Sequence, residues 1–437
     1  MDKSEIIHET TISYGRLEEL LQKSLKTTAQ FARCSAKRIG EQQGFAARIV
    51  RVKIEWSTPA ADDKGGSSLP ASVVLKVPST VSSDEVMTDL GKTELGQSLK
   101  SALGDGQKAA SVSKRMALAH NKECAFYRLA AGREEQLKVP RTYHIEDSMP
   151  ESGEIGLIVM EDLSTKGVVK DLWDEATPSL LNDLASALAS LHALTMRESQ
   201  WRDEAVLLAT AGDEDEPSMS DEQVKQIGEM VAGTMEGALS AYYSKDIVDY
   251  YREKLASQPF SEVRQLMLYQ RDQAHKEMGL PSVLVHGDFR LSNMVIRKDE
   301  KGDDRLVAII DWQTAHIGSP AEDFGRFFCM STRRETRRLR TTSTLGHYHH
   351  CLSKACEGKA PFSLEQLGRH YRELFHLAFV AHAPGVPFMA LSGTAFAHAV
   401  DKDAAKEAVV GNAADLYRDI IQIERDHRAP WEERTAL

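Results

Sequence analysis

The chain has 437 residues, and its hydrophobic fraction of 42% and charged fraction of 27% are those of a folded globular protein. A chain of this length is expected to form two lobes or domains, each with its own apolar core. The 65 acidic residues outnumber the 54 basic residues, so the net charge of -11 argues against a surface that binds nucleic acid.

The cysteines indicate a reducing compartment, because they are odd in number and include no C-x-x-C pair that would favour a zinc ribbon or a disulfide framework. They are Cys34, Cys124, Cys329, Cys351 and Cys356. The first residues, MDKSEIIHETTISYG, do not resemble a signal peptide, and the sequence has no run of 18 or more apolar residues. We therefore expect a cytoplasmic protein with no membrane partner, while its oligomeric state stays open.

Hydrophobic periodicity predicts a helix and then a β-hairpin near the N-terminus. Leu17, Leu20, Leu21 and Leu25 recur at helical spacing. The stretch ARIVRVKIEW then alternates apolar and polar residues, and ASVVLKV follows after a segment rich in turn-forming residues. These two stretches are expected to pair as strands.

The rest of the first 160 residues is expected to be mixed, and the remainder mainly helical. Residues 82–130 are rich in helix formers, and residues 143–145 and 155–160 are expected to be short strands. Farther along, Thr177 can cap a helix that Pro178 begins. The helical pattern gives way between residues 281 and 310 to three short apolar runs, VLVHGD, NMVIR and LVAIID, with polar residues at their ends.

The stretch VLVHGDFRLSN carries the first candidate catalytic residues. An apolar run leads to a turn that contains Asp288, and Asn293 follows five residues later. Phosphoryl transfer needs a carboxylate to orient the attacking hydroxyl and accept its proton, together with oxygen ligands that hold Mg²⁺ against the triphosphate. The spacing of Asp288 and Asn293 matches the catalytic loop of kinases, in which the aspartate is the base and the asparagine binds metal.

A second carboxylate follows eighteen residues after Asn293. Asp311 ends the apolar run LVAIID, where a carboxylate could bind Mg²⁺ that bridges phosphate oxygens. Trp312 and Gln313 follow it, so the D-F-G of protein kinases is absent, as are H-R-D and A-P-E. Protein kinase activity is therefore disfavoured.

The combination of H-G-D-x-x-x-x-N and I-I-D-W resembles the aminoglycoside phosphotransferase and choline kinase superfamily. VVLKVP, HNKECAFY, VMEDLSTKGV and AIIDWQTAHIGSPAEDFGRF resemble its CHK-kinase-like, or ecdysteroid-kinase-like, branch. The resemblance implies an α+β, bilobal protein-kinase-like fold. A small mixed N-lobe with an antiparallel sheet would span residues 1–160, and a larger, mainly helical C-lobe with the catalytic loop, metal site and acceptor pocket would span residues 161–437.

The same resemblance assigns roles to further residues. Lys76 would contact the α- and β-phosphates of ATP and Glu123 would pair with it, Asn293 and Asp311 would hold Mg²⁺, and Asp323 would be a structural aspartate near the catalytic loop. The hinge between the lobes, whose backbone would bind adenine, would consist of Met160, Glu161, Asp162 and Leu163. The phosphate-covering loop is reduced, because GEQQGFAAR lacks the G-x-G-x-x-G pattern.

Each of these residues also has an ordinary structural interpretation. A lysine in a strand is more often exposed, and the Asp288 and Asn293 side chains could cap a turn. His286 is expected to orient backbone rather than act as a base. The histidines at 347, 349 and 350, with Cys351, fit no standard zinc spacing, so a solvated helix is expected there.

The function expected from the sequence is ATP- and Mg²⁺-dependent phosphorylation of a hydroxyl group on a small molecule. The branch resemblance points to a steroid-like or other small alcohol, with choline and aminoglycosides as more distant precedents. The alternative is a catalytically silent kinase fold that binds nucleotide or a metabolite, which the reduced glycine loop favours. The acidic net charge would suit a cationic acceptor, although summed charge says little about one pocket.

Overall fold

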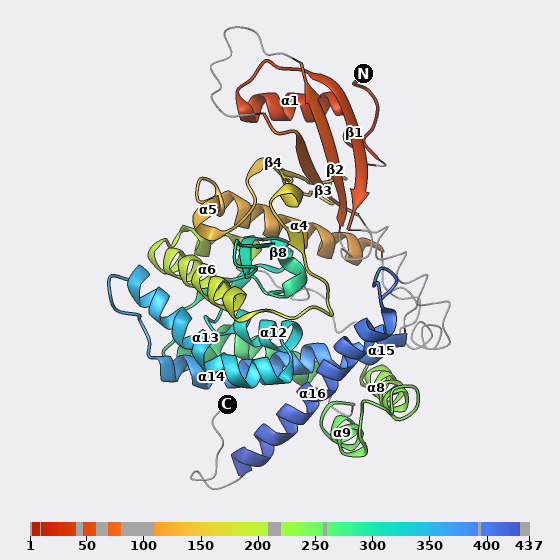
Figure 1. Cartoon of the computed structure of the whole chain (residues 1–437), viewed down its shortest axis with the longest axis vertical. Coiled ribbons are helices and arrows are strands. Elements are labelled where there is room, and N and C mark those ends of the chain that lie inside the picture. Colours follow the sequence, from red (N-terminus) through yellow and green to blue (C-terminus); the bar gives the residue numbers. More distant parts are fainter. Residues whose placement is uncertain are drawn as a thin grey trace.

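A computed structural model gives the structure of the chain and describes residues 2–8, 10–40, 47–57, 69–79, 109–208, 220–256, 260–391 and 395–428. An antiparallel sheet with one helix beside it forms the part at the top of Figure 1, and a larger, mainly helical part lies below it. This arrangement confirms the expected α+β fold with a small mixed N-terminal part and a larger helical C-terminal part.

The N-terminal sheet has five strands in the order β1-β2-β3-β5-β4, and every neighbouring pair is antiparallel. The predicted hairpin is confirmed, since its two strands pair from Ala47 opposite Pro78 to Lys53 opposite Ser72. The strand before them was not predicted. The strands are β1 (Phe31–Ile39), β2 (Ala47–Trp56), β3 (Ser72–Pro78), β4 (Thr142–Glu146) and β5 (Leu157–Glu161).

Helix α1 (Tyr14–Leu25) forms as its leucine spacing predicts. The Ser13 side chain accepts a hydrogen bond from the Arg16 amide and caps the helix start. The helix buries Leu17 and Leu21 in a core that also contains Val50 and Val52 of β2. Alternate residues of each strand therefore face α1, which leaves the opposite face of the sheet toward the rest of the molecule.

Helix α4 (Ala109–Ala130) lies between the sheet and the helical part (Figure 1). It lies within the region expected to be helical, residues 82–130, of which residues 82–108 lie outside the described residues. After α4 come α5 (Glu134–Leu137) and the last two strands of the sheet. The chain leaves the sheet at Glu161, so the expected division between residues 160 and 161 falls at the end of β5.

The helical part begins with α6 (Pro178–Arg197), which starts as predicted with Pro178 in the first turn and Thr177 as its cap. Its central leucines are buried in the large core of the molecule. The later helices are α7 (Ala205–Leu208), α8 (Asp221–Glu236), α9 (Lys245–Tyr251), α10 (Phe260–Tyr269), α11 (His275–Glu277), α12 (Glu322–Ser331), α13 (Arg334–Ala355), α14 (Leu364–His382), α15 (Val386–Leu391) and α16 (Lys402–Arg428).

Two small antiparallel sheets interrupt the helices, and they include the three apolar runs noted between residues 281 and 310, together with two short strands that were not predicted. One joins β6 (Val168–Val169), β8 (Met294–Lys298) and β9 (Asp304–Ile309), and the other joins β7 (Val283–Val285) to β10 (His316–Gly318). The candidate catalytic loop connects β7 to β8, and Asp311 lies between β9 and β10. The two sheets therefore bring the two candidate segments together.

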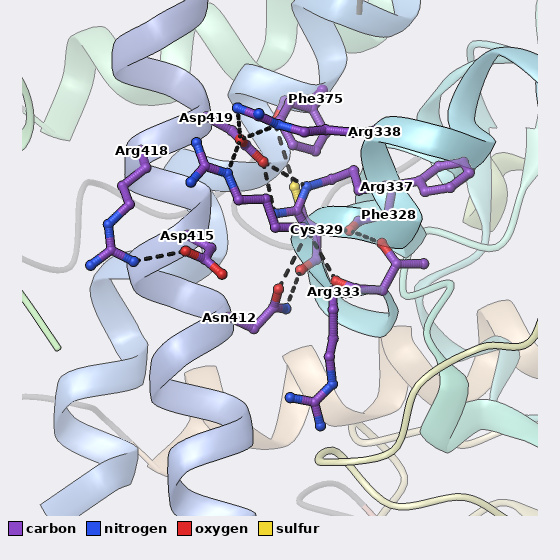
Figure 2. A network of polar contacts seen from close by, with 12 residues as sticks. Phe328, Cys329, Arg333, Arg337, Arg338, Phe375, Asn412, Asp415, Arg418 and Asp419 are labelled. Atoms are coloured by element: carbon purple, nitrogen blue, oxygen red, sulfur yellow. Dashed lines mark hydrogen bonds and ion pairs between the residues drawn. The ribbon is translucent and has the colours of Figure 1, made fainter.

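A buried ion-pair network joins α13 to α16 (Figure 2). The Asp419 carboxylate, whose side chain is 3% exposed, receives hydrogen bonds from three guanidiniums of α13. Arg337 is as buried as Asp419, and it also donates to the backbone carbonyls of Phe328 and Thr332. The other two arginines are Arg334 and Arg338. One carboxylate thus fixes the N-terminal turns of α13 against the long C-terminal helix.

Residues 364–391 form the only stretch among the described helices that is long and apolar enough to cross a membrane, judged by length and composition alone. The stretch comprises α14, a 3-10 turn at Ala383–Gly385 and α15. Leu374 and Phe375 of α14 are buried in the large core, where α14 packs on α12. The backbone of Gly325 approaches Leu374 so closely that an added Cβ would lie 3.1 Å from its carbonyl oxygen.

Candidate active site

Lys76 of β3 joins the two parts of the molecule. Its ammonium lies 2.5 Å from the Glu123 carboxylate of α4 and 2.5 Å from the Asp311 carboxylate after β9. The Lys76 side chain is 8% exposed, which excludes the interpretation as an ordinary surface lysine. Three residues that are far apart in the sequence therefore meet at one buried point, and the pair of Lys76 with Glu123 is the one that the resemblance implied.

The charges at this point do not balance. Burial acts to lower the pKa of Lys76, but the Asp311 and Glu123 carboxylates outweigh it and raise the pKa. Burial raises the pKa of Glu123, even though Lys76 acts in the opposite direction. With one cation between two carboxylates, the cluster is one negative charge in excess when all three are ionised. A bound cation would offset this excess.

The rings of Trp312 and Phe126 fix Asp311 relative to Glu123. They stack with centroids 3.6 Å apart and an angle of 7° between their planes. Phe126 lies one turn of α4 after Glu123, and Trp312 directly follows Asp311. Asp311 itself has a left-handed backbone, with φ of 68°, a conformation that costs energy for a residue with a side chain and often occurs at functional sites.

In the candidate catalytic loop, the Asn293 side-chain amide donates hydrogen bonds to Asp288. Asn293 belongs to a short 3-10 turn, Leu291–Asn293, and it is buried. Its Nδ2 donates to the Asp288 backbone carbonyl at 2.8 Å and to a carboxylate oxygen of Asp288 at 3.2 Å. Because Nδ2 is used in this way, the Oδ1 atom of Asn293 is the atom left to bind a metal.

His286 connects the catalytic loop to the segment that carries Asp311. Its Nδ1 accepts a hydrogen bond from the Asp288 amide at 3.2 Å, so Nε2 must carry the proton and donates to the Ile310 carbonyl at 3.0 Å. The Ile310 amide donates to the Asn293 carbonyl at 3.0 Å. Both backbone polar groups of Ile310 are therefore bonded to the catalytic loop, and His286 orients backbone as expected.

Asp323 of α12 is hydrogen-bonded to the backbone of the same loop. Its two carboxylate oxygens accept hydrogen bonds from the amides of His286 and Gly287, at 2.8 and 3.0 Å. Gly287 has a φ of 79°, and an added Cβ would lie 2.5 Å from the Thr314 carbonyl oxygen. The glycine is thus required by backbone geometry and by the close approach of the chain after Asp311. Asp323 has the structural role that the resemblance implied.

Two arginines beside Asp288 were not identified from the sequence. Arg290 donates its Nε to one carboxylate oxygen of Asp288 at 3.0 Å, and Arg326 of α12 lies 3.7 Å from the other oxygen. Burial acts to raise the pKa of Asp288, but the two guanidiniums outweigh it and lower the pKa. Both arginines stand inside the motifs HGDFRLSN and DFGRF, but those motifs do not indicate that the side chains meet.

The proposed hinge is held by the side chain of Asp162. Its carboxylate accepts hydrogen bonds from the Ser72 hydroxyl at 2.7 Å and the Ser164 amide at 3.0 Å, and it pairs with Arg51 at 2.9 Å. Asp162 therefore ties the chain after β5 to strands β2 and β3.

One backbone amide of the proposed hinge already donates a hydrogen bond within the protein. Met160 is buried in the large core, and the Glu161 amide donates to the Arg141 carbonyl at 2.8 Å. Leu163 begins a 3-10 turn, Leu163–Thr165. Any adenine contact in this segment must therefore use a backbone group other than the Glu161 amide. In the reduced glycine loop, Gly40 has a φ of 69°, whereas residues 41–46, with Gly44 among them, lie outside the described residues.

No group of three or more His, Cys, Asp or Glu side chains could hold a metal in the part of the chain that the structure describes. The expectation of a solvated helix at residues 347–351 fails for His347 and His349, which are partly buried because α13 packs against α6, whereas His350 is exposed as expected. His347 lies 3.0 Å from the Ser186 hydroxyl, and His349 lies 2.8 Å from the Phe362 carbonyl oxygen. The His347 ring therefore links α13 to α6, and the His349 ring links α13 to the segment that precedes α14.

The site as a whole presents three chemical features. A buried lysine lies between two carboxylates, an aspartate is held by an asparagine in the neighbouring loop, and two arginines flank that aspartate. Carboxylate and amide oxygens are the ligands that Mg²⁺ prefers, usually one or two from the protein with the remainder from phosphates and water. The donor set of Asp311 and Asn293 fits this description.

Sequence comparison matches one family. The family model described as DUF1679, "Uncharacterized oxidoreductase dhs-27", covers residues 1–428. The search of curated proteins found no significant match.

Comparison of structures finds phosphotransferases. An ethanolamine kinase from Plasmodium vivax has a TM-score of 0.44 at 11% identity, over 95% of this chain and 92% of that one. A choline kinase from Cryptosporidium parvum has a TM-score of 0.41 at 11% identity, over 93% and 96% of the two chains. A macrolide 2'-phosphotransferase from Brachybacterium faecium has a TM-score of 0.37 at 16% identity, over 90% and 98%. At these identities the similarity does not extend to a substrate.

Proposed function

We propose that this chain, which belongs to the DUF1679 family, is a phosphotransferase that moves the γ-phosphoryl group of ATP to a hydroxyl group of a small molecule. The observation that carries the proposal is the meeting of Lys76 with Glu123 and Asp311, at 2.5 Å in each case, next to the loop that holds Asp288. Phosphoryl transfer relies on positioning and charge more than on covalent chemistry, and this cluster supplies both.

Lys76 is the residue proposed to bind the nucleotide phosphates. In the structure its ammonium contacts Asp311 directly, so phosphate oxygens would replace that carboxylate as partners when ATP binds. Glu123 would then hold the ammonium in place, because it is buried at the end of a short ion pair. The adenine ring would contact the backbone of residues 160–163.

Asp288 is the residue proposed to act on the acceptor. The acceptor oxygen attacks the γ-phosphorus, the bond from that phosphorus to the β–γ bridging oxygen breaks, ADP leaves, and the hydroxyl proton passes to Asp288. The lowered pKa keeps Asp288 ionised, so the carboxylate can accept a hydrogen bond from the hydroxyl before transfer. The Asn293 amide fixes the carboxylate in the orientation that this requires.

Asn293 and Asp311 are the residues proposed to hold Mg²⁺. Their oxygens fit the ion, and the negative charge in excess at Lys76, Glu123 and Asp311 is the charge that a cation would offset. Bound Mg²⁺ would neutralise charge on the phosphate oxygens. The hydrogen bond between the Ile310 amide and the Asn293 carbonyl keeps the two candidate ligand segments adjacent.

The acceptor proposed from the sequence is a hydroxylated small molecule, and the resemblance to the ecdysteroid-kinase-like branch adds a steroid-like alcohol as a specific candidate. Substrate-contacting residues are expected in the helical part, after Asp171. A neutral steroid alcohol therefore belongs in any panel of acceptors.

The family description names an oxidoreductase, and the geometry favours phosphoryl transfer over that activity. A nicotinamide dinucleotide is typically bound by parallel strands with a glycine-rich turn before a helix. All strand pairs among the described residues are antiparallel, so no such unit is present in that part of the chain. Oxidation or reduction of NAD(P) by the protein, with no ADP formed, would favour the family description instead.

Incubation of the protein with ATP, Mg²⁺ and a panel of hydroxylated metabolites tests the proposal. Mass spectrometry should find one added phosphate on an acceptor, with ADP formed in equal amount and no reaction when Mg²⁺ is omitted. Asp288→Asn should lower turnover by about 10²-fold or more while the protein stays folded. Glu300→Gln, which also replaces a carboxylate by an amide but in an exposed turn, is the matched control.

Two results would contradict the proposal. Full activity of Asp288→Asn would remove the catalytic role of that carboxylate. Binding of ATP without ADP formation for every acceptor would favour the alternative, a silent kinase fold that binds nucleotide or a metabolite.

A further inference from the structure

The surroundings of Asp288 are positively charged, unlike those of Lys76. Arg290 and Arg326 both contact the Asp288 carboxylate. Among the described residues, each of these arginines forms its ion pair with Asp288. Two guanidiniums against one carboxylate leave one positive charge in excess. The candidate acceptor side of the site therefore differs in sign from the cluster proposed to hold metal and nucleotide.

His382 adds no charge to the surroundings of Asp288. It lies at the end of α14, where burial and the charges of Arg326 and Arg290 lower its pKa to about 4. The ring is thus neutral at pH 7. Of the two carboxylates on α12, Asp323 is buried and accepts two backbone amides, and Glu322 lies 3.0 Å from His316. Among the described residues, no ion pair joins either of these carboxylates to Arg290 or Arg326.

Arg326 has the geometry of a residue that can accept a further partner. Its contact with Asp288 is loose, at 3.7 Å through one terminal nitrogen, and its side chain is 32% exposed. Arg290 uses Nε for Asp288, which leaves its two terminal nitrogens for another ligand. A guanidinium presents paired N–H groups that match the two oxygens of a carboxylate or phosphate.

We infer that the acceptor carries an anionic group, a carboxylate or a phosphate, near its reacting hydroxyl, and that Arg326 and Arg290 bind this group. This inference rests on the proposed function and narrows its substrate class. Binding of the anion beside Asp288 would place the hydroxyl next to the carboxylate that receives its proton. A cationic acceptor, which the net charge of the chain favours, would meet repulsion here.

Ion-exchange fractionation of a metabolite extract tests the charge of the acceptor without knowledge of its identity. Anionic, neutral and cationic fractions at pH 7 are each incubated with the protein, ATP and Mg²⁺, and phosphorylated products are found by mass spectrometry. The acceptor should be in the anionic fraction. Treatment of that fraction with alkaline phosphatase, followed by removal of the phosphatase, separates the two sources: a carboxylate acceptor survives and a phosphate acceptor is lost.

The variant Arg326→Gln then tests the residue. It should raise KM for the acceptor in the anionic fraction by about tenfold or more and leave KM for ATP unchanged. Arg297→Gln on β8, an exposed arginine next to the same loop in sequence, is the matched control and should change neither constant.

The outcomes separate this inference from the proposed function. An acceptor found in the neutral or cationic fraction overturns the inference and leaves a phosphotransferase. A loss of kcat in Arg326→Gln with unchanged acceptor KM also overturns it, since the guanidinium would then act on the transferred phosphoryl group. Absence of any phosphorylated product, together with no binding of ATP and Mg²⁺, overturns the proposed function and the inference with it.

Discussion

Trp312 stacks on Phe126 with ring centroids 3.6 Å apart, and this contact joins the helix that carries Glu123 to the turn that carries Asp311. The His286 ring lies 4.5 Å from the Trp312 ring, so the catalytic loop belongs to the same packed unit. All three side chains are buried. The distances among the candidate catalytic groups therefore depend on a buried aromatic cluster.

Replacement of Trp312 by alanine should destabilise the protein by about 3–5 kcal/mol, because a large side chain leaves a cavity that its neighbours cannot fill. Urea unfolding followed by circular dichroism measures this change. Leu339→Ala is the control, since Leu339 is 68% exposed and its loss should change stability by less than about 0.5 kcal/mol. An unfolding free energy equal to that of the wild type would show that the stack does not hold the site together.

Replacement of Lys76 by methionine should lower kcat/KM for ATP by about 10²-fold, since it removes the cation proposed to bind phosphates and leaves two carboxylates facing them. The kinetics of ADP formation measure the effect. Lys53→Met on the neighbouring strand, where the side chain is exposed, is the matched control. Equal losses in the two variants would mean that Lys76 acts only through the stability of the sheet.

The sequence predicted several of the elements and the candidate catalytic motif because both depend on local patterns. The alternation in β2 and β3 and the H-G-D-x-x-x-x-N spacing can be recognised without any long-range contact. The contact of Arg326 with Asp288 could not be, since it depends on how α12 packs beneath the catalytic loop. The first strand, β1, was missed because residues 31–39 alternate only weakly between apolar and polar, with charged residues on the exposed face.

Asp419→Asn should destabilise the protein by about 3–5 kcal/mol, because Arg337 would stay buried without a negative partner. Denaturant unfolding of the wild type and the variant measures the difference. Asp415→Asn is a close control on the same helix (Figure 2), since its pair with Arg418 is about one-third exposed on each side and should contribute no more than about 1 kcal/mol. Similar losses in both variants would contradict the special role of the buried carboxylate.

Two buried histidines should make the protein less stable at mildly acidic pH. Burial lowers the pKa of His192 to about 3, and burial together with His275 lowers the pKa of His370 to about 4. Both side chains are fully buried. An unfolded histidine has a pKa near 6.5, so between about pH 6.5 and pH 4 the unfolded chain binds more protons than the folded one.

The unfolding free energy should therefore fall by about 1 kcal/mol for each of these histidines as the pH drops from 7.5 to 5.5. His316 acts in the opposite direction, because its partner Glu322 raises its pKa against the effect of burial. Urea unfolding at the two pH values should show a smaller loss for His370→Gln than for the wild type, and His350→Gln, at an exposed position, should lose as much as the wild type. If the unfolding free energy of His370→Gln fell by as much as that of the wild type, the acid sensitivity would arise at other groups.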